Sequence, residues 1–166
     1  MQDNHGRAHT LYVGVDVAAA TVTAAWVAYD DRMSAPLTVA QTPQGYATLH
    51  ERLAATGIAP TDTLIVLEAT GSYWIRLATT LVERGYHVSV VNPKRAHDCA
   101  KVLLKRAKTD AIDAQTLTRL GALLQPAPWT PPPAIYTELQ QRLVHRDALT
   151  VRRQQLRNQR HALTQQ

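Results

Sequence analysis

The sequence has one cysteine, no phenylalanine and no apolar run long enough to cross a membrane. The single thiol, Cys99, excludes an internal disulfide framework and suits a reducing compartment, so we expect a cytoplasmic protein. The apolar runs have the length of strands, far short of the ~20 residues of a transmembrane helix. The polar first residues lack the pattern of a signal peptide. Disulfide-rich secreted proteins and membrane proteins are therefore not expected.

Basic residues outnumber acidic ones and are concentrated in the second half of the chain. Lys and Arg total 18 against 13 Asp and Glu, a formal net charge of +5 over 166 residues. Residues 1–90 carry five basic and eight acidic side chains, whereas residues 91–166 carry thirteen and five. This asymmetry is typical of a half that binds a polyanion, although a solvated helical surface would have the same charge. The hydrophobic fraction of 45% is sufficient for a folded core.

Apolar periodicity predicts hairpin strands first and a strand–helix–strand unit after them. The expected strands are residues 11–17, 21–29, 36–41, 63–67 and 87–91. Thr42 as N-cap and Pro43 at the first helical position begin the first helix. The unit from Thr63 to Val91 favours a parallel pair of strands with a right-handed crossover. The fold class is therefore α/β, with a mixed five-stranded sheet flanked by helices.

The rest of the chain is predicted to be helical, with one proline-rich interruption. Helices are expected at residues 95–104 and 109–124. The last helix has Leu149, Leu156 and Leu163 at a spacing of seven, and Arg146, Arg153 and Arg160 likewise. Such a seam predicts a weakly pairing helix whose arginines face a phosphate backbone or an acidic partner; a frayed, solvated helix is the alternative. The domain prediction is a disordered tail at residues 1–10, an α/β domain at 11–125, a stiff linker at 126–133 and a long basic helix at 134–166.

Two carboxylates lie on strands where an apolar residue would be expected. Asp16 shares one strand face with Tyr12 and Gly14, and burying it unpaired would cost several kcal/mol. Gly14 removes bulk where another group has to approach closely. Glu68 follows the most apolar strand at its carboxyl end, where α/β sheets present ligand-binding groups. Either residue alone is compatible with an exposed structural position, so only their combination is informative.

A second acidic pair, Asp110 and Asp113, follows the helix N-cap Thr109. The spacing of three places both carboxylates on one helical face, although acidic residues in a first turn are also ordinary capping. Together the four carboxylates would raise one another's pKa values unless a divalent cation relieved the repulsion. Their hard oxygen ligands select Mg²⁺ or Mn²⁺ over zinc. Paired ions of this kind activate the attacking oxygen and stabilise the leaving oxygen of a phosphodiester.

Basic residues surround this acidic pair in the sequence. The expected contacts to nucleic-acid phosphates are Lys94, Arg95, Lys101, Lys105, Arg106 and Lys108. Two other candidate sites are weaker. His97 and Cys99 form an isolated pair that we interpret as structural. Ser72 stands where the following helix needs an N-cap, and no His is placed to activate it as a nucleophile.

Several segments, in this order, resemble the N-terminal domain of the DEDD transposases of the insertion-sequence 110 family, which includes the pilin-gene invertase. These segments are Gly14-Val15-Asp16-Val17, Thr42-Pro43-Gln44-Gly45, Leu67-Glu68-Ala69-Thr70-Gly71-Ser72-Tyr73, Val91-Asn92-Pro93 and Arg106-Ala107-Lys108-Thr109-Asp110-Ala111-Ile112-Asp113-Ala114. The resemblance implies a RuvC-like, ribonuclease H type fold. It also implies that Asp16, Glu68, Asp110 and Asp113 form a tetrad that binds Mg²⁺.

The same resemblance implies a DNA recombinase, guided in many members by a structured non-coding RNA and assembled as dimers or tetramers. The family commonly has Ser-Lys after the first Asp, whereas Ala18 and Ala19 stand here. Family members continue into a domain that supplies a Ser nucleophile, whereas this sequence stops at Gln166. We therefore expect a Mg²⁺-dependent transposase domain that is inactive for full strand exchange by itself, in a bacterial cytoplasm and on the nucleoid when bound to DNA. The alternatives are a free-standing junction nuclease and a non-catalytic nucleic-acid-binding and dimerisation module.

Overall fold

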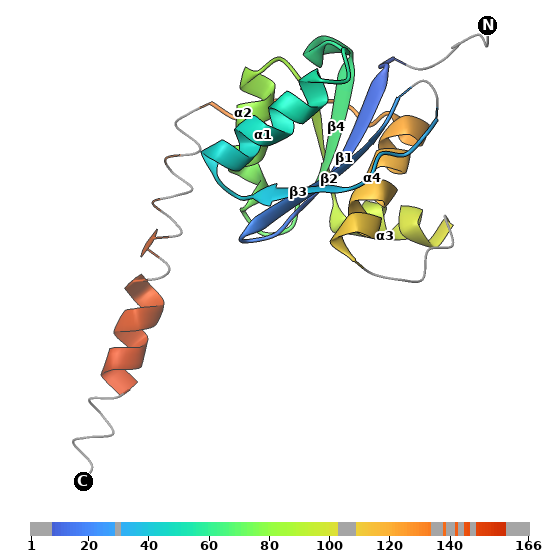
Figure 1. Cartoon of the computed structure of the whole chain (residues 1–166). Coiled ribbons are helices and arrows are strands. Elements are labelled where there is room, and N and C mark those ends of the chain that lie inside the picture. Colours follow the sequence, from blue (N-terminus) through green and yellow to red (C-terminus); the bar gives the residue numbers. More distant parts are fainter. Residues whose placement is uncertain are drawn as a thin grey trace, which may run out of the picture. The chain divides into compact units, whose positions relative to one another are not determined.

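The computed structural model describes residues 8–28, 31–102, 109–133, 138, 142, 145–146 and 149–158. The chain divides into two compact units, Met1–Trp129 and Thr130–Gln166, and each is described by itself. The first unit contains the sheet and the four helices that pack against it (Figure 1). No helix in the described ranges is both long and apolar enough to span a membrane.

Five strands form one mixed sheet in the first unit. The strands are β1 (Leu11–Val17), β2 (Thr21–Val27), β3 (Leu37–Ala40), β4 (Thr63–Glu68) and β5 (His87–Val91). Their spatial order is β3-β2-β1-β4-β5. The β1–β2 and β2–β3 pairs are antiparallel, whereas β1–β4 and β4–β5 are parallel. This order and these directions confirm the expected mixed sheet of a ribonuclease H type fold, with β1 at its centre.

Helices cover both faces of this sheet. They are α1 (Pro43–Ala54), α2 (Trp74–Glu83), α3 (Pro93–Val102) and α4 (Asp110–Leu124), with a short 3₁₀ helix η1 (Pro60–Asp62) before β4. Figure 1 shows α1 and α2 on one side of the sheet and α3 and α4 on the other. Helix α4 packs against the sheet more extensively than the other helices do, and it lies against β1, β2 and β4.

The buried side chains form two clusters, one on each face of the sheet. One contains alternate β1 residues with the apolar faces of α1 and α2: Val13, Val15, Leu49, Leu53, Leu77 and Leu81. The other contains the intervening residues of β1 and β4 with α4: Tyr12, Leu64, Val66, Leu117 and Leu120. Because side chains alternate along a strand, Gly14 and Asp16 share the α4 face with Tyr12. The strand parity therefore decides which helix Asp16 meets.

Most expected elements are confirmed to within a few residues. Thr42 caps α1 by accepting a hydrogen bond from the Gly45 amide at 3.2 Å, and Pro43 is the first helical residue. The prediction for Ser72 is wrong, because α2 begins at Trp74 and its N-cap is Tyr73, which makes no side-chain capping bond. The Trp74 indole instead donates to the Gly71 carbonyl at 3.1 Å and closes the preceding turn, which delays the start of the helix.

The segment that follows α4 is packed along the outer edge of β5. The Trp129 amide donates to the Val88 carbonyl at 2.6 Å, and the Ser89 hydroxyl reaches the Pro126 carbonyl at 2.6 Å. The Trp129 ring meets Trp74 edge to face, with centroids 5.4 Å apart. Residues 126–129, which composition places in a linker, are thus attached to the first unit, and they cover a strand edge that would otherwise be unpaired.

The beginning of the described chain is bonded to η1 and to the C-terminal end of α4. The Thr10 amide donates to the Asp62 carbonyl at 2.8 Å, and the Ala8 amide donates to the Gln125 side chain at 2.8 Å. Composition places these residues in a disordered tail because they are polar. Here hydrogen bonds, which hydropathy does not encode, hold them in place; residues 1–7 lie outside the described ranges.

Candidate active site

Asp16 and Glu68 lie side by side at the carboxyl ends of two parallel strands. Val15 of β1 pairs with Leu67 of β4, so the two carboxylates occupy the next position on neighbouring strands. Because side chains alternate along a strand, both residues lie on the face of the sheet that α4 covers, and both are half-buried. The parallel β1–β4 pairing therefore brings together two residues that are 52 positions apart in the sequence.

Helix α4 approaches β1 unusually closely, and Gly14 permits this. A Cβ at Gly14 would overlap the Ala114 carbonyl oxygen and the Thr118 amide nitrogen, and would lie 2.7 Å from the Leu117 carbonyl carbon. Any side chain other than hydrogen would thus push the helix away. The expectation that Gly14 makes room for another group is confirmed, and that group is the backbone of α4.

The first turn of α4 carries the other two carboxylates. Thr109 is the N-cap and accepts a hydrogen bond from the Ile112 amide at 3.3 Å, as predicted. Asp110 is exposed and Asp113 is half-buried. Both lie in the first turn, where unpaired backbone amides favour negative charge. The acidic turn is therefore stabilised locally while it adds negative charge to the site.

The charges of the other three carboxylates act on Asp16. Burial is the largest cause that raises the pKa of Asp16 to about 6, and the charges of Asp110, Asp113 and Glu68 follow in that order. A hydrogen bond with the Val17 backbone opposes them. Glu68 on β4 and the two carboxylates at the start of α4 therefore add to the effect of burial on the pKa of Asp16.

Thr70 holds Glu68 in position, a role that the sequence alone did not indicate. Its hydroxyl donates to Glu68 Oε1 at 2.7 Å, and its amide donates to the Glu68 carbonyl at 2.9 Å. A Thr two residues after a strand end is a common turn former, which is the only signal that could have identified it. Thr70 thereby limits the orientations open to this carboxylate.

The donor chemistry of the group fits a hard divalent cation. Four carboxylates provide oxygen ligands only, which suits Mg²⁺ or Mn²⁺. Among the described residues, no three Asp, Glu, His or Cys side chains are already arranged so that they could hold a metal ion. The carboxylates would therefore have to move closer together to hold a metal ion.

Comparison with known proteins identifies the family. The family model described as "Transposase", for DEDD transposases of insertion sequence 110 (IS110), matches residues 13–166. The chain belongs to the IS110 family of DEDD transposases. A pilin gene-inverting protein of Moraxella bovis is 36% identical over 120 residues, which cover 72% of this chain and 37% of that protein. The protein of the same name from Moraxella lacunata is 35% identical over the same shares of both chains.

This IS110-family chain thus spans 37% of the length of the curated relatives it matches. Among solved structures, the fowlpox virus Holliday junction resolvase is similar with a TM-score of 0.43 and 16% identity, covering 69% of this chain and 99% of the resolvase. The same resolvase in complex with Holliday junction DNA gives a TM-score of 0.44 at 16% identity, over 66% and 97%. The family is established by the profile match and the relatives, and the fold by the strand order.

The basic residues expected to contact phosphates are only partly visible in this IS110-family chain. Lys94 is exposed at the start of α3, where its amide donates to Asn92 Oδ1 at 2.8 Å. Arg95 and Lys101 belong to α3, but their side chains lie outside the described ones. Lys105, Arg106 and Lys108 lie outside the described residues altogether. Their contacts to nucleic acid therefore stay a prediction.

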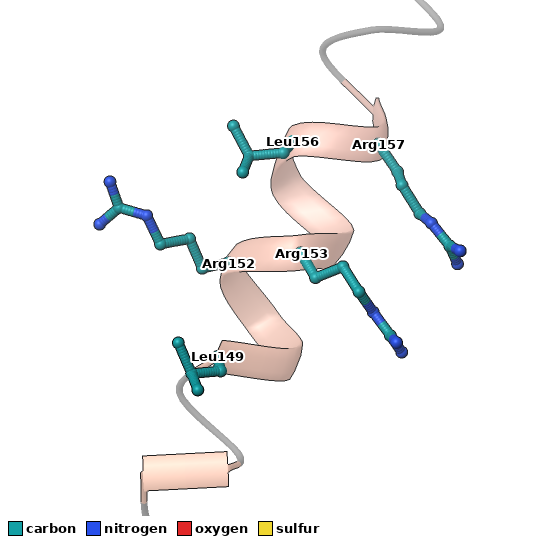
Figure 2. A pocket seen from close by; sticks show the side chains of 5 residues that line it. All are labelled: Leu149, Arg152, Arg153, Leu156 and Arg157. Carbon is teal, nitrogen blue, oxygen red and sulfur yellow. The ribbon is translucent and has the colours of Figure 1, made fainter.

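The second unit presents leucines and arginines on a helical segment. Residues 149–158 are helical and exposed. Figure 2 shows Arg153 and Arg157 extending on one side of this helix, with Leu149, Arg152 and Leu156 on the other. Leu149 and Leu156 are 54% and 58% exposed, so neither is covered within the described part of this unit. Leu163 and Arg160, the other predicted repeats, fall outside it.

Proposed function

We propose that this chain is the metal-dependent catalytic domain of an IS110-family DNA recombinase. In this proposal Asp16, Glu68, Asp110 and Asp113 hold Mg²⁺, or Mn²⁺, beside a phosphodiester of the DNA. The observation that carries it is the placement of the four residues: the parallel β1–β4 pairing sets Asp16 beside Glu68, and α4, whose first turn carries Asp110 and Asp113, packs against β1. Family membership supports the same function, since the curated relatives are named for inverting a pilin gene.

The residues of the chain have distinct roles in this proposal. Asp16 on the central strand would hold the divalent ions together with Glu68 and the α4 pair, Asp110 and Asp113. Thr70 would keep Glu68 turned towards the site through its hydrogen bond. A bound divalent ion would supply activation of the attacking oxygen and stabilisation of the leaving oxygen. Half-burial of Asp16 keeps part of the site away from water, which strengthens its interaction with a cation.

The proposal includes partners besides DNA. The basic set Lys94, Arg95, Lys101, Lys105, Arg106 and Lys108 would hold a nucleic-acid backbone next to the carboxylates. A structured guide RNA would select the DNA, and two or four copies of the chain would form the working assembly. A further domain carrying a Ser nucleophile would complete strand exchange, so we expect this chain alone to bind branched DNA with little turnover.

Calorimetric titration of Mn²⁺ and Mg²⁺ tests the metal site. Asp16→Asn and Asp113→Asn should each lower the affinity at least tenfold, because each removes a ligand. Asp62→Asn is the matched control, since Asp62 immediately precedes β4 and so lies at the opposite end of that strand from Glu68. Equal metal binding by the wild-type protein and all three variants would refute the site.

One observation favours a non-catalytic nucleic-acid-binding module as the second candidate. Among the described residues, the carboxylates are not arranged so that three of them could hold a metal ion, whereas the described arginines of the second unit are exposed. This alternative expects affinity for RNA or DNA that falls with salt but is unchanged by magnesium or by Asp16→Asn. The proposed recombinase domain expects magnesium to change the binding of branched DNA, and Asp16→Asn to abolish that change.

A further inference from the structure

We infer that Thr118 is a positioning residue whose hydroxyl fixes α4 on the central strands and thereby sets Asp110 and Asp113 opposite Asp16. Thr118 is fully buried, and its Oγ1 lies within hydrogen-bond distance of three backbone groups. The hydroxyl accepts from the Gly14 amide at 3.0 Å. Its single hydrogen has two carbonyl acceptors, Ala25 and Ala114, each at 2.9 Å.

The place of these bonds in the sheet is unusual. Gly14 and Ala25 are register partners on β1 and β2, so one helix side chain bonds to both members of a strand pair. Helix–sheet contacts are ordinarily apolar, and apolar contacts are not directional. A hydroxyl that accepts from one strand and donates to the next defines a single position along both, because either bond is lost when the helix shifts.

Gly14 and Thr118 act as one contact. The absent side chain of Gly14 lets the α4 backbone touch β1, and the Thr118 hydroxyl then accepts a hydrogen bond from the Gly14 amide at this contact. The bonds hold the helix towards the sheet and prevent it from rotating about its axis. Gly14 supplies the space, and Thr118 supplies the specificity of position.

The consequence for the site follows from helix geometry. At a rise of ~1.5 Å per residue, Thr118 lies ~12 Å from Asp110 and ~8 Å from Asp113 along the helix axis. A continuous helix transmits the position of Thr118 to its first turn, which carries Asp110 and Asp113. The functional part of this inference rests on the proposed metal site, whereas the placement of α4 can be tested without metal.

The same helix offers a matched control. Thr116 is also buried, but its hydroxyl donates only to the Ile112 carbonyl of its own helix, at 2.8 Å. Thr116→Val therefore removes a buried hydroxyl from α4 without touching the bonds to the strands. Thr118→Val removes the bonds to Gly14 and Ala25 at nearly constant volume, and Thr118→Ser retains the hydroxyl.

Amide hydrogen exchange of the metal-free 166-residue chain tests the placement. Exchange at Gly14 and over residues 110–114 should be at least tenfold faster in Thr118→Val than in wild type. Thr118→Ser and Thr116→Val should stay close to wild type. Equal exchange in folded Thr118→Val and Thr116→Val would overturn the inference. If Thr118→Val does not fold, Thr118→Ala compared with Thr116→Ala decides in the same way.

Mn²⁺ titration of the same variants tests the link to the site. Thr118→Val should bind Mn²⁺ at least tenfold more weakly, with affinity rescued by Thr118→Ser and unchanged by Thr116→Val. A purely structural role would lower the unfolding temperature but leave the Mn²⁺ affinity of the folded protein unaltered, and would overturn the link. If wild type bound Mn²⁺ no more tightly than Asp16→Asn, the proposed function would be refuted instead. The hydrogen-exchange measurement would still decide whether Thr118 positions α4.

Discussion

At the scale of the residue, Asp16 carries a carboxylate where the strand would be more stable without one. Burial and the charges of Asp110, Asp113 and Glu68 raise its pKa to about 6. The other strand position that faces α4 nearby, Gly14, is specialised in the opposite sense, because it has no side chain at all. Two neighbouring positions on one strand face thus lower the stability of the strand. Asp16 does so through its charge, and Gly14 through the conformational freedom of its backbone.

Asp16→Asn should stabilise the metal-free protein at neutral pH. An unfolded Asp titrates near pH 4, so the folded state retains the Asp16 proton between about pH 4 and 6 and loses stability as the pH rises through that range. Above pH 6 the variant should gain about 1–2 kcal/mol in unfolding free energy, reduced from the full linkage value because solvent screens a half-exposed group. Urea titrations at pH 4 and pH 7.5 measure this, and a variant no more stable than wild type at pH 7.5 would contradict it.

Gly14→Ala should strongly destabilise the first unit. The added methyl group would overlap backbone atoms of α4, which cannot move aside like a flexible side chain. We expect a loss of about 3 kcal/mol or more in unfolding free energy, measured by chemical denaturation. Gly57→Ala is the control, since its Cβ meets nothing within 4 Å and only its φ of +75° is unfavourable, at about 1 kcal/mol. Equal losses in the two variants would argue against the close packing of α4.

At the scale of the element, α4 connects the core to the chemistry. Its buried face packs on β1, β2 and β4, while its first turn carries Asp110 and Asp113. The same helix therefore has to be both a core element and the support of the candidate site. Its N-terminal turn is stabilised by Thr109 rather than by burial, which makes the cap relevant to the carboxylates.

Thr109→Ala should loosen the acidic turn of α4. Loss of the cap is expected to cost about 1 kcal/mol in unfolding free energy and, because the first turn frays, to lower Mn²⁺ affinity several-fold. Thr42→Ala removes the equivalent cap of α1 and should cost a similar free energy without changing Mn²⁺ affinity. Denaturation and calorimetry measure the two effects, and a parallel drop of metal affinity in both variants would sink the idea.

At the scale of the whole molecule, the first unit extends to Trp129. Residues 126–129 cover the edge of β5, and Trp129 packs against Trp74. A chain ending at Trp129 should therefore unfold at the same temperature as the full chain. A chain ending at Gln125 should lose about 2 kcal/mol or more, because Trp129 and its contacts are removed. Thermal unfolding of the two truncations makes the comparison, and equal unfolding temperatures would contradict this boundary.

The sequence alone determined the order and type of the elements. Alternating apolar residues identified the strands, Thr42 and Pro43 marked the start of α1, and the four acidic residues were recognisable because they interrupt apolar patterns or share one helical turn. These signals are local, since each depends on residues a few positions apart. The resemblance to IS110 transposases rests on the same residues and is confirmed by the family match.

Only the tertiary structure decided how those residues meet. Hydropathy did not indicate that Trp129 bonds to β5 or that Thr10 bonds to η1, because backbone hydrogen bonds across long sequence separations leave no compositional trace. Nor did the sequence distinguish Thr118 from Thr116, two threonines on one helix, although a single hydroxyl bonds to both β1 and β2. The choice depends on which face of α4 touches Gly14, and that contact exists only when strand and helix are packed together.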